Sequence, residues 1–164
     1  MGVADDITAS FKLAMRRMTS PVCLITTRAD DQLYGMTATA VQSVSADPPS
    51  LLICINRSAS ISRPLSLRGR FAVNVLRTAH ADLVSIFSGK AENKDRFRYG
   101  NWTELEDMPV LQDAQAIMIC DRAETLAVGS HDVLIGEVRA VRVGSEISTL
   151  LYEDGKLVRS LCLD

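Results

Sequence analysis

Hydroxyl-bearing residues gather in the segment GMTATAVQSVSADPP, which covers residues 35–49. Thr37, Thr39, Ser43 and Ser45 stand there among small side chains, which let a ligand lie against the backbone. Hydroxyl and backbone N–H groups can donate hydrogen bonds to phosphate oxygens without the help of Lys or Arg. The same residue types also occur in ordinary strands and turns, so this segment alone does not distinguish a phosphate site from a plain strand.

A second polar segment, NRSASISRP, follows the next apolar run and covers residues 56–64. Asn56, Ser58 and Ser60 can each cap the N-terminus of a helix, and Arg57 and Arg63 stand beside them. A helix start is a natural anion site because its free N–H groups point at the ligand. The two segments together predict a site that contacts one phosphate group from two sides.

The supply of metal ligands is small. The chain has two histidines, which are too few for a three-His site, and its four cysteines form no CxxC pair. The glycines form neither the GxGxxG fingerprint of dinucleotide-binding domains nor a GxxxxGK[ST] phosphate loop. We therefore expect no metal, and we expect free, buried thiols of a reducing cytoplasm at Cys23, Cys54, Cys120 and Cys162.

Length and charge restrict the class of protein. The 164 residues suit a single domain spanning 1–164. Lys and Arg number 18 against 20 Asp and Glu, a net charge of −2, so we expect no nucleic-acid partner. No apolar run approaches the roughly 18 residues that span a bilayer, and the chain starts without a secretory signal pattern. We expect a cytoplasmic protein without membrane contact.

The elements that would position these residues are mostly strands. Turns are predicted at Asp30, Asp31 and Gln32 and at Asp154 and Gly155. The polar stretch 89–101 is expected to be a mobile loop. The other expected elements are a helix over 7–19, strands over 21–27 and 33–45, a strand over 50–56 buried on both faces, a helix ending at Gly69, a strand over 71–76, a helix ending at Gly89, strands over 115–128 and 132–144, and a hairpin over 149–160. This order favours a mainly β fold, a β-barrel with flanking helices, over a doubly wound parallel sheet.

From Phe11 to Val158 the chain resembles the flavin reductase family, the FMN-binding split barrels that include reductase components of two-component flavin-dependent monooxygenases. The resemblance rests on the order of VCLITT, GMTATAVQSVSADPPSLLICIN, FAVNVL, IFSG, KDRF, the run that leads through MPVLQDAQAIMIC, GSHDVLIGEV and LYEDGKL. It implies a split barrel of Greek-key type and a homodimer. Ser130 stands where the family's GDH-like motif has an acidic residue.

The resemblance also implies which residues meet the ligands. Those that would bind FMN or FAD are Thr37, Ala38, Thr39, Ala40, Val41, Ser43, Val44, Cys54, Ile55, Asn56, Ser60, Ile61, Ile86 and Phe87. His131 would face the nicotinamide of NADH or NADPH in a positioning role, because hydride transfer needs no enzymic proton donor at the transferring carbon. The segment along the dinucleotide would comprise Tyr152, Glu153, Asp154 and Gly155.

The function expected from the resemblance is an NAD(P)H:flavin oxidoreductase. A hydride would pass from the nicotinamide to FMN or FAD, and the reduced flavin would supply a partner monooxygenase. Two alternatives stay open from the residues. One is a reductase of the same fold that acts on another acceptor, such as a corrinoid. The other is a flavin-binding carrier or sensor that does not turn over.

Overall fold

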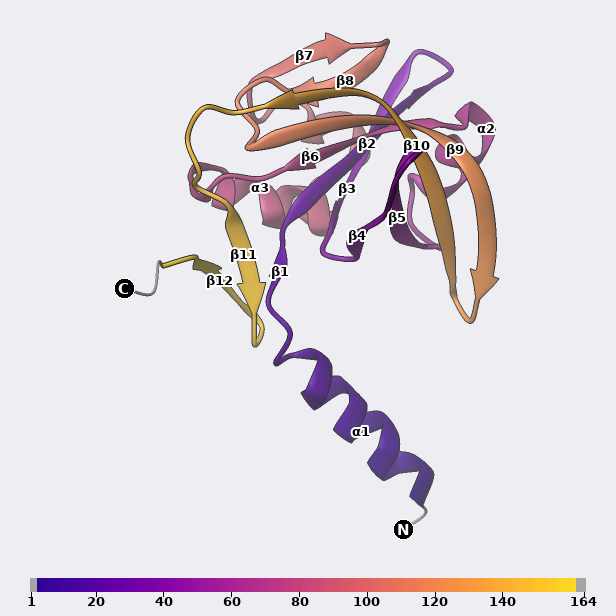
Figure 1. Cartoon of the computed structure of the whole chain (residues 1–164), viewed down its shortest axis with the longest axis vertical. Coiled ribbons are helices and arrows are strands. Elements are labelled where there is room, and N and C mark those ends of the chain that lie inside the picture. The colour runs from indigo at the N-terminus through magenta and orange to yellow at the C-terminus, as the bar shows by residue number, and fades with distance from the viewer. Residues whose placement is uncertain (1–2, 162–164) are drawn as a thin grey trace.

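A seven-stranded antiparallel sheet curves into a barrel at the centre of the protein (Figure 1). The computed structural model describes residues 3–161. In the order of hydrogen-bonded neighbours, the strands are β3 (Gln32–Ala38), β2 (Cys23–Ala29), β6 (Arg70–Val75), β9 (Ala116–Val128), β10 (His131–Val143), β5 (Pro49–Asn56) and β4 (Val41–Ala46). The edge strands β3 and β4 are not paired with each other, so the barrel is split between them. The expected fold class, a split β-barrel with flanking helices, is confirmed.

The expected extended stretch 33–45 therefore forms two strands at opposite edges of the sheet. The chain leaves β3 at Ala38 and enters β4 at Val41. Residues Thr39 and Ala40 cross the opening, where the backbone N–H of Cys54 donates to the carbonyl oxygen of Ala40 at 3.2 Å. The hydroxyl-bearing segment 35–49 thus lies along the split.

One hydrophobic cluster lies inside the barrel, and a second lies on the outer face of β2, β6 and β9. Strand β5 shows how the strands face the first cluster. Leu51, Ile53 and Ile55 are buried, whereas Leu52 and Cys54 are half-buried. This alternation is typical of an antiparallel strand with one face on the core. The expectation of a strand buried on both faces is wrong, because the outer face of β5 is only partly covered.

Short helices and a hairpin flank the barrel, and several of them pack on the outer face of the sheet. They are α2 (Ser62–Arg68), η1 (Thr78–His80), α3 (Ala81–Ser85), η2 (Ile86–Lys90), α4 (Asn93–Arg96), β7 (Trp102–Leu105) and β8 (Met108–Leu111). The helix end expected at Gly69 is confirmed, and Gly69 caps α2 in the left-handed conformation. The helical segment expected to end at Gly89 runs to Lys90, with a non-helical backbone at Gly89 (φ 113°). The stretch 89–101 is not a plain loop, since it contains α4, and the β7–β8 hairpin was not expected from the sequence.

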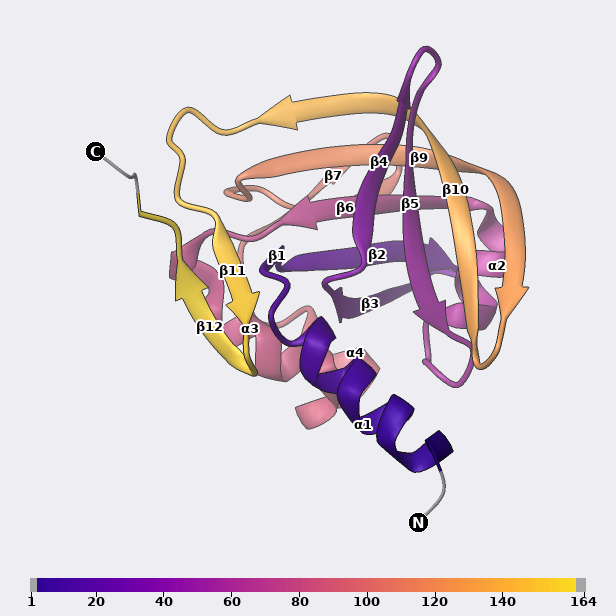
Figure 2. The ribbon, with the colours of Figure 1, turned by 60° about the horizontal axis from the view of Figure 1, so that its bottom comes forward.

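The N-terminal helix α1 (Val3–Met15) extends away from the barrel (Figures 1 and 2). It begins and ends earlier than the expected 7–19, and its apolar residues Phe11 and Leu13 are each 62% exposed. A small sheet of β1 (Ser20–Pro21), β11 (Leu150–Glu153) and β12 (Lys156–Arg159) lies at its base. There the Nε atom of Arg16 donates to Asp154 Oδ1 at 3.0 Å. Among the described helices, none is both long and apolar enough to cross a membrane.

Candidate functional site

Three of the residues expected to bind flavin line one pocket of about 320 Å³, here called the Arg96 pocket. They are Thr37 from β3, Ser60 from the turn before α2, and Phe87 from η2. The remaining lining residues are Met36, Ala59, Ser88, Gly89 and Arg96. Thr37 and Ser60 belong to the two different polar segments, so the structure brings one hydroxyl residue of each into the same pocket.

Arg96 brings a positive charge to this pocket, and sequence reasoning missed it. Its Nη1 atom donates to the carbonyl oxygen of Gly35 at 2.7 Å, and its Nε atom donates to that of Ala91 at 3.1 Å. Among the described side chains, no carboxylate forms an ion pair with it. Burial lowers the pKa of the Arg96 guanidinium from its ordinary value. A half-buried, uncompensated guanidinium beside hydroxyl groups fits a phosphate ligand.

The only signal for Arg96 in the sequence is its place in the motif KDRF, inside a segment that was interpreted as a loop. Its position depends on aromatic packing within the segment 87–102. The ring of Phe97 packs edge-on against Phe87, with centroids 5.4 Å apart, and lies 4.8 Å from the ring of Trp102. The Trp102 indole N–H donates to the carbonyl oxygen of Tyr99 at 2.6 Å, so Trp102 anchors this segment.

Gly35 allows Phe87 to pack against β3. A Cβ atom on Gly35 would lie 2.6 Å from the Phe87 ring, closer than any side chain can tolerate. Since Gly35 also accepts the hydrogen bond from Arg96, the same residue sets the position of two walls of the pocket.

The hydroxyl groups of the pocket differ in their partners. Thr37 donates its Oγ1 hydrogen to the carbonyl oxygen of Val84 at 3.1 Å, which leaves its oxygen free to accept from a ligand. The Ser60 side chain is exposed at the pocket edge. The expected helix capping is wrong, because α2 starts after Ile61 without a side-chain cap. Asn56 instead closes its own turn, accepting at 2.9 Å from both the N–H and the hydroxyl of Ser58.

The other eleven residues expected at the flavin fall into three groups. Ala38, Ile55 and Ile61 have side chains in the core, so a ligand could reach only their backbone. Six lie on the surface along the split or are half-buried near it: Thr39, Ala40, Val41, Ser43, Val44 and Cys54. Asn56 ends β5 on the same face as Cys54, and Ile86 is half-buried beside Phe87. None of these residues lines the Arg96 pocket itself.

His131 begins β10 directly opposite Asn56 of β5. Its side chain is exposed, and Nδ1 lies 3.0 Å from the hydroxyl oxygen of Ser130. Arg57 contacts the adjoining turn in three ways. Its backbone N–H donates to the Ser130 carbonyl oxygen at 3.0 Å, and its guanidinium donates to the Gly129 carbonyl oxygen. Its Nη1 atom also lies 3.9 Å from Asp132 Oδ1. His131 thus stands at the end of the barrel where the turn that leads to Ser60 begins.

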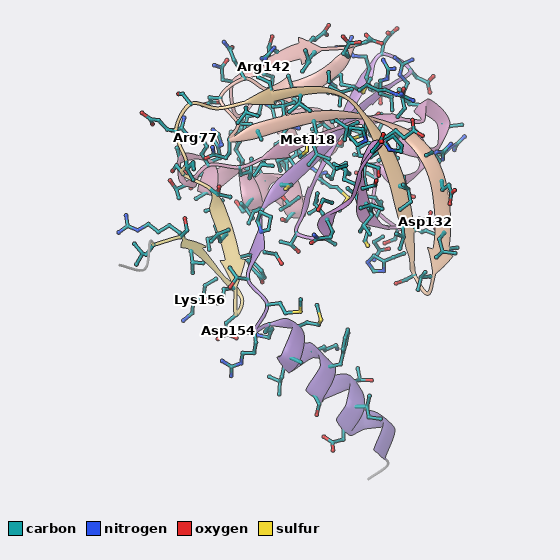
Figure 3. The ribbon with its side chains drawn as sticks, in the orientation of Figure 1. Arg77, Met118, Asp132, Arg142, Asp154 and Lys156 are labelled. Carbon is teal, nitrogen blue, oxygen red and sulfur yellow. The ribbon has the colours of Figure 1, made fainter. Side chains whose placement is uncertain are left out.

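The second expected nicotinamide segment lies elsewhere in the chain. Tyr152, Glu153, Asp154 and Gly155 form the tip of the β11–β12 hairpin, next to α1. Figure 3 shows Asp154 on the opposite side of the molecule from Asp132, the neighbour of His131, and Figure 2 shows the same separation of the hairpin from the start of β10. One chain alone does not bring the two expected nicotinamide segments together.

The cysteines are free thiols wherever the structure describes them. Cys23 and Cys120 are buried as expected, and burial raises the pKa of each thiol to about 12. Cys54 is only half-buried, on the outer face of β5, so the expectation of full burial is wrong there. Cys162 lies outside the described residues.

Several known proteins are similar to this chain in sequence and in fold. The flavin reductase like domain matches residues 15–160. The chain is 39% identical over 147 residues to "FMN reductase (NADH) RutF" of Variovorax paradoxus (strain S110), covering 89% of this chain and 82% of that protein. It is 37% identical over 155 residues to the reductase component of the FADH(2)-dependent resorcinol hydroxylase of Rhizobium sp. (strain MTP-10005), covering 93% and 87%. The crystal structure of a flavin reductase domain protein from Arthrobacter sp. FB24 superposes with a TM-score of 0.88 at 28% identity, covering 96% and 98%. This chain therefore belongs to the flavin reductase-like domain family.

Proposed function

We propose that this protein is an NAD(P)H-dependent flavin reductase that passes a hydride from NADH or NADPH to FMN or FAD and supplies the reduced flavin to a partner oxygenase. The observation that carries the proposal is the Arg96 pocket, in which Thr37, Ser60 and Phe87 meet an unpaired guanidinium. Membership of the family and the names of the relatives, which include an NADH-dependent FMN reductase and the reductase component of a hydroxylase, support the same activity.

In this proposal the residues of the chain bind and orient the reactants. Arg96 and Ser60 hold the flavin phosphate, and Thr37 accepts a hydrogen bond from the ribityl chain. Bound flavin supplies the hydride acceptor. The backbone along Thr39 and Ala40, with Cys54 and Asn56 opposite, forms the surface for the ring. His131 positions the nicotinamide by stacking or hydrogen bonding, and the gain comes from holding the two rings at reacting distance.

We also propose a single functional domain that acts as a homodimer. The separation of His131 from the Tyr152–Gly155 segment supports a site completed by a second copy. Exposed apolar side chains support it too, since Phe11 and Leu13 of α1 and Leu126 and Val128 of β9 would otherwise face water. Light scattering after gel filtration should give twice the mass of one chain, and Phe11→Asp combined with Leu13→Asp should reduce the dimer. A wild-type monomer that reduces flavin at full rate would overturn this part of the proposal.

The activity is tested by mixing the protein anaerobically with FMN or FAD and with NADH or NADPH, and following the visible flavin absorbance. The proposal expects bleaching much faster than in the same mixture without protein. Flavin that is retained on gel filtration without NAD(P)H oxidation would instead identify a carrier or sensor. Nicotinamide oxidation only in the presence of a corrinoid would identify a reductase of another acceptor. Adding the purified partner oxygenase with its substrate then tests whether reduced flavin is transferred.

A further inference from the structure

A second pocket meets the Arg96 pocket at Ser60, and the proposed flavin reductase activity gives it no role. This pocket of about 380 Å³, here called the Arg63 pocket, lies between α2 and the β2–β3 turn. Its lining residues are Ala29, Asp30, Tyr34, Ser60, Arg63, Pro64 and Leu67. Because Ser60 lines both pockets, a ligand whose phosphate lies at Ser60 in one pocket can continue into the other.

The two pockets lie one after the other along β3. Thr37 and Met36 line the Arg96 pocket, and Tyr34 lines the Arg63 pocket. A strand advances roughly 3.3 Å per residue, so Thr37 and Tyr34 are separated by roughly 10 Å along the strand. That length suits a ligand longer than a mononucleotide, with its phosphates near the middle.

Arg63 supplies the Arg63 pocket with a positive charge. In the described part of the chain it forms no ion pair with a carboxylate. The pocket also contains one carboxylate, Asp30, at the β2–β3 turn, where φ is positive. Arg96 and Arg63 therefore line two pockets that share Ser60, an arrangement that suits two linked phosphates better than one.

The rest of the Arg63 pocket suits a nucleoside. The half-buried ring of Tyr34 is held by its hydroxyl, which donates to Gln32 Oε1 at 3.0 Å. Two residues of α2 complete this apolar lining, the exposed Leu67 and the buried Pro64. Aromatic and apolar side chains bind the flat face of a base, and the Asp30 carboxylate can accept hydrogen bonds from ribose hydroxyls or an exocyclic amine.

We propose that the Arg63 pocket binds the adenylate half of FAD, so that this protein binds FAD more tightly than FMN. The inference rests on the proposed function, since it takes the flavin phosphate to lie between Ser60 and Arg96. FAD is FMN extended by a second phosphate, a ribose and an adenine, and the Arg63 pocket offers Arg63 for the phosphate, Asp30 for the ribose or the exocyclic amine, and Tyr34 for the adenine ring. The relatives' names include both FMN and FADH(2), so the preference of this chain follows from its own residues.

The test measures the dissociation constants of FMN and FAD by titration calorimetry with the full chain and with Arg63→Ala. Arg63 is exposed, so its replacement does not endanger the fold. Wild-type protein is expected to bind FAD about tenfold more tightly than FMN, and Arg63→Ala should remove most of that advantage while FMN binding stays within about twofold. Arg142→Ala is the matched control, because this arginine is exposed on β10 and lines neither pocket.

Two further measurements separate the possible outcomes. Tyr34→Leu should weaken FAD binding and spare FMN, and added AMP should compete with FAD but not with FMN. Equal affinities of the wild type for both flavins, or an equal loss of both in Arg63→Ala, would overturn the adenylate site while leaving the reductase proposal intact. Failure of both flavins to bind wild-type protein would overturn both proposals.

Discussion

The Nη1 atom of Arg96 donates a hydrogen bond to the carbonyl oxygen of Gly35 at 2.7 Å. This contact joins α4, in a polar segment without an apolar pattern, to β3, an edge strand of the barrel. The backbone hydrogen bond therefore holds a positive charge at the pocket lined by Thr37 and Ser60, and no carboxylate of the described residues forms an ion pair with it. The charge is therefore available to an anionic ligand.

Replacing Arg96 with Gln should weaken FMN binding by about tenfold, which corresponds to about 1.4 kcal/mol, because a charge-assisted hydrogen bond to phosphate is lost. Riboflavin lacks the phosphate, so its affinity should change little. Fluorescence titration of both flavins checks this, with Arg96→Lys as the variant that keeps the charge and retains part of the affinity. Equal weakening of FMN and riboflavin would show that Arg96 only supports the fold.

Replacing Gly35 with Ala should lower the free energy of unfolding by about 1–3 kcal/mol, because the new Cβ would overlap the Phe87 ring. Urea denaturation measures the loss, and flavin affinity should fall with it since Phe87 lines the pocket. Combining Gly35→Ala with Phe87→Leu tests the cause, because the smaller side chain should restore part of the loss. Strictly additive losses in the double variant would contradict the steric explanation.

Replacing His131 with Ala should raise the Michaelis constant for NADH or slow flavin reduction by about tenfold, and it should leave flavin affinity unchanged. The reason is that His131 lies at the start of β10, opposite Asn56 and outside the Arg96 pocket. Stopped-flow reduction at varied NADH concentration, with flavin titration beside it, separates the two effects. A parallel loss of flavin binding would place His131 on the flavin side of the site.

Replacing Asp121 with Asn should destabilise the protein at pH 7 and have less effect near pH 3. Hydrogen bonds from Arg70 and, secondarily, Arg139 lower the pKa of Asp121 below its ordinary value of 3.8. A lowered folded-state pKa stabilises the protein above the unfolded value, and this contribution is lost as the pH falls through the folded value. The groups are partly exposed, so each pair should contribute less than about 1 kcal/mol.

Urea unfolding of the wild type and Asp121→Asn at both pH values measures this difference. Arg139→Gln removes one partner of the same carboxylate and should show the same trend with a smaller amplitude. A difference that stays constant between pH 7 and pH 3 would show that the substitution acts through packing and not through the ionised carboxylate.

Local patterns in the sequence predicted much of the fold. The Asp154–Gly155 turn was predicted because both residues tolerate positive φ, and they have φ values of 47° and 80°. The end of α2 at Gly69 was predicted for the same reason. The strands of the sheet follow from runs of β-branched and apolar residues whose preference is local.

The elements missed by sequence reasoning depend on contacts between distant segments. The stretch 89–101 has no apolar periodicity, and α4 is held by Arg96 on Gly35 and by Phe97 against Phe87. The resemblance implied a split barrel but not where it splits, because the residue pattern of 33–45 predicts one continuous extended stretch and not the two edge strands β3 and β4. Whether such a stretch turns from one edge of a barrel to the other depends on which strands it pairs with, and pairing is non-local.

The sequence by itself determined the class of the protein: the order of its strands and turns and its hydroxyl-rich segments follow from side-chain size, branching and hydrogen-bonding capacity, which act locally. Only the tertiary structure decided how these segments combine. It brought Thr37, Ser60 and Phe87 into one pocket, added Arg96, and separated His131 from the Asp154 hairpin within one chain. The physical reason is that a site needs side chains from several strands at one place, and sheet pairing and aromatic packing across the chain set that place.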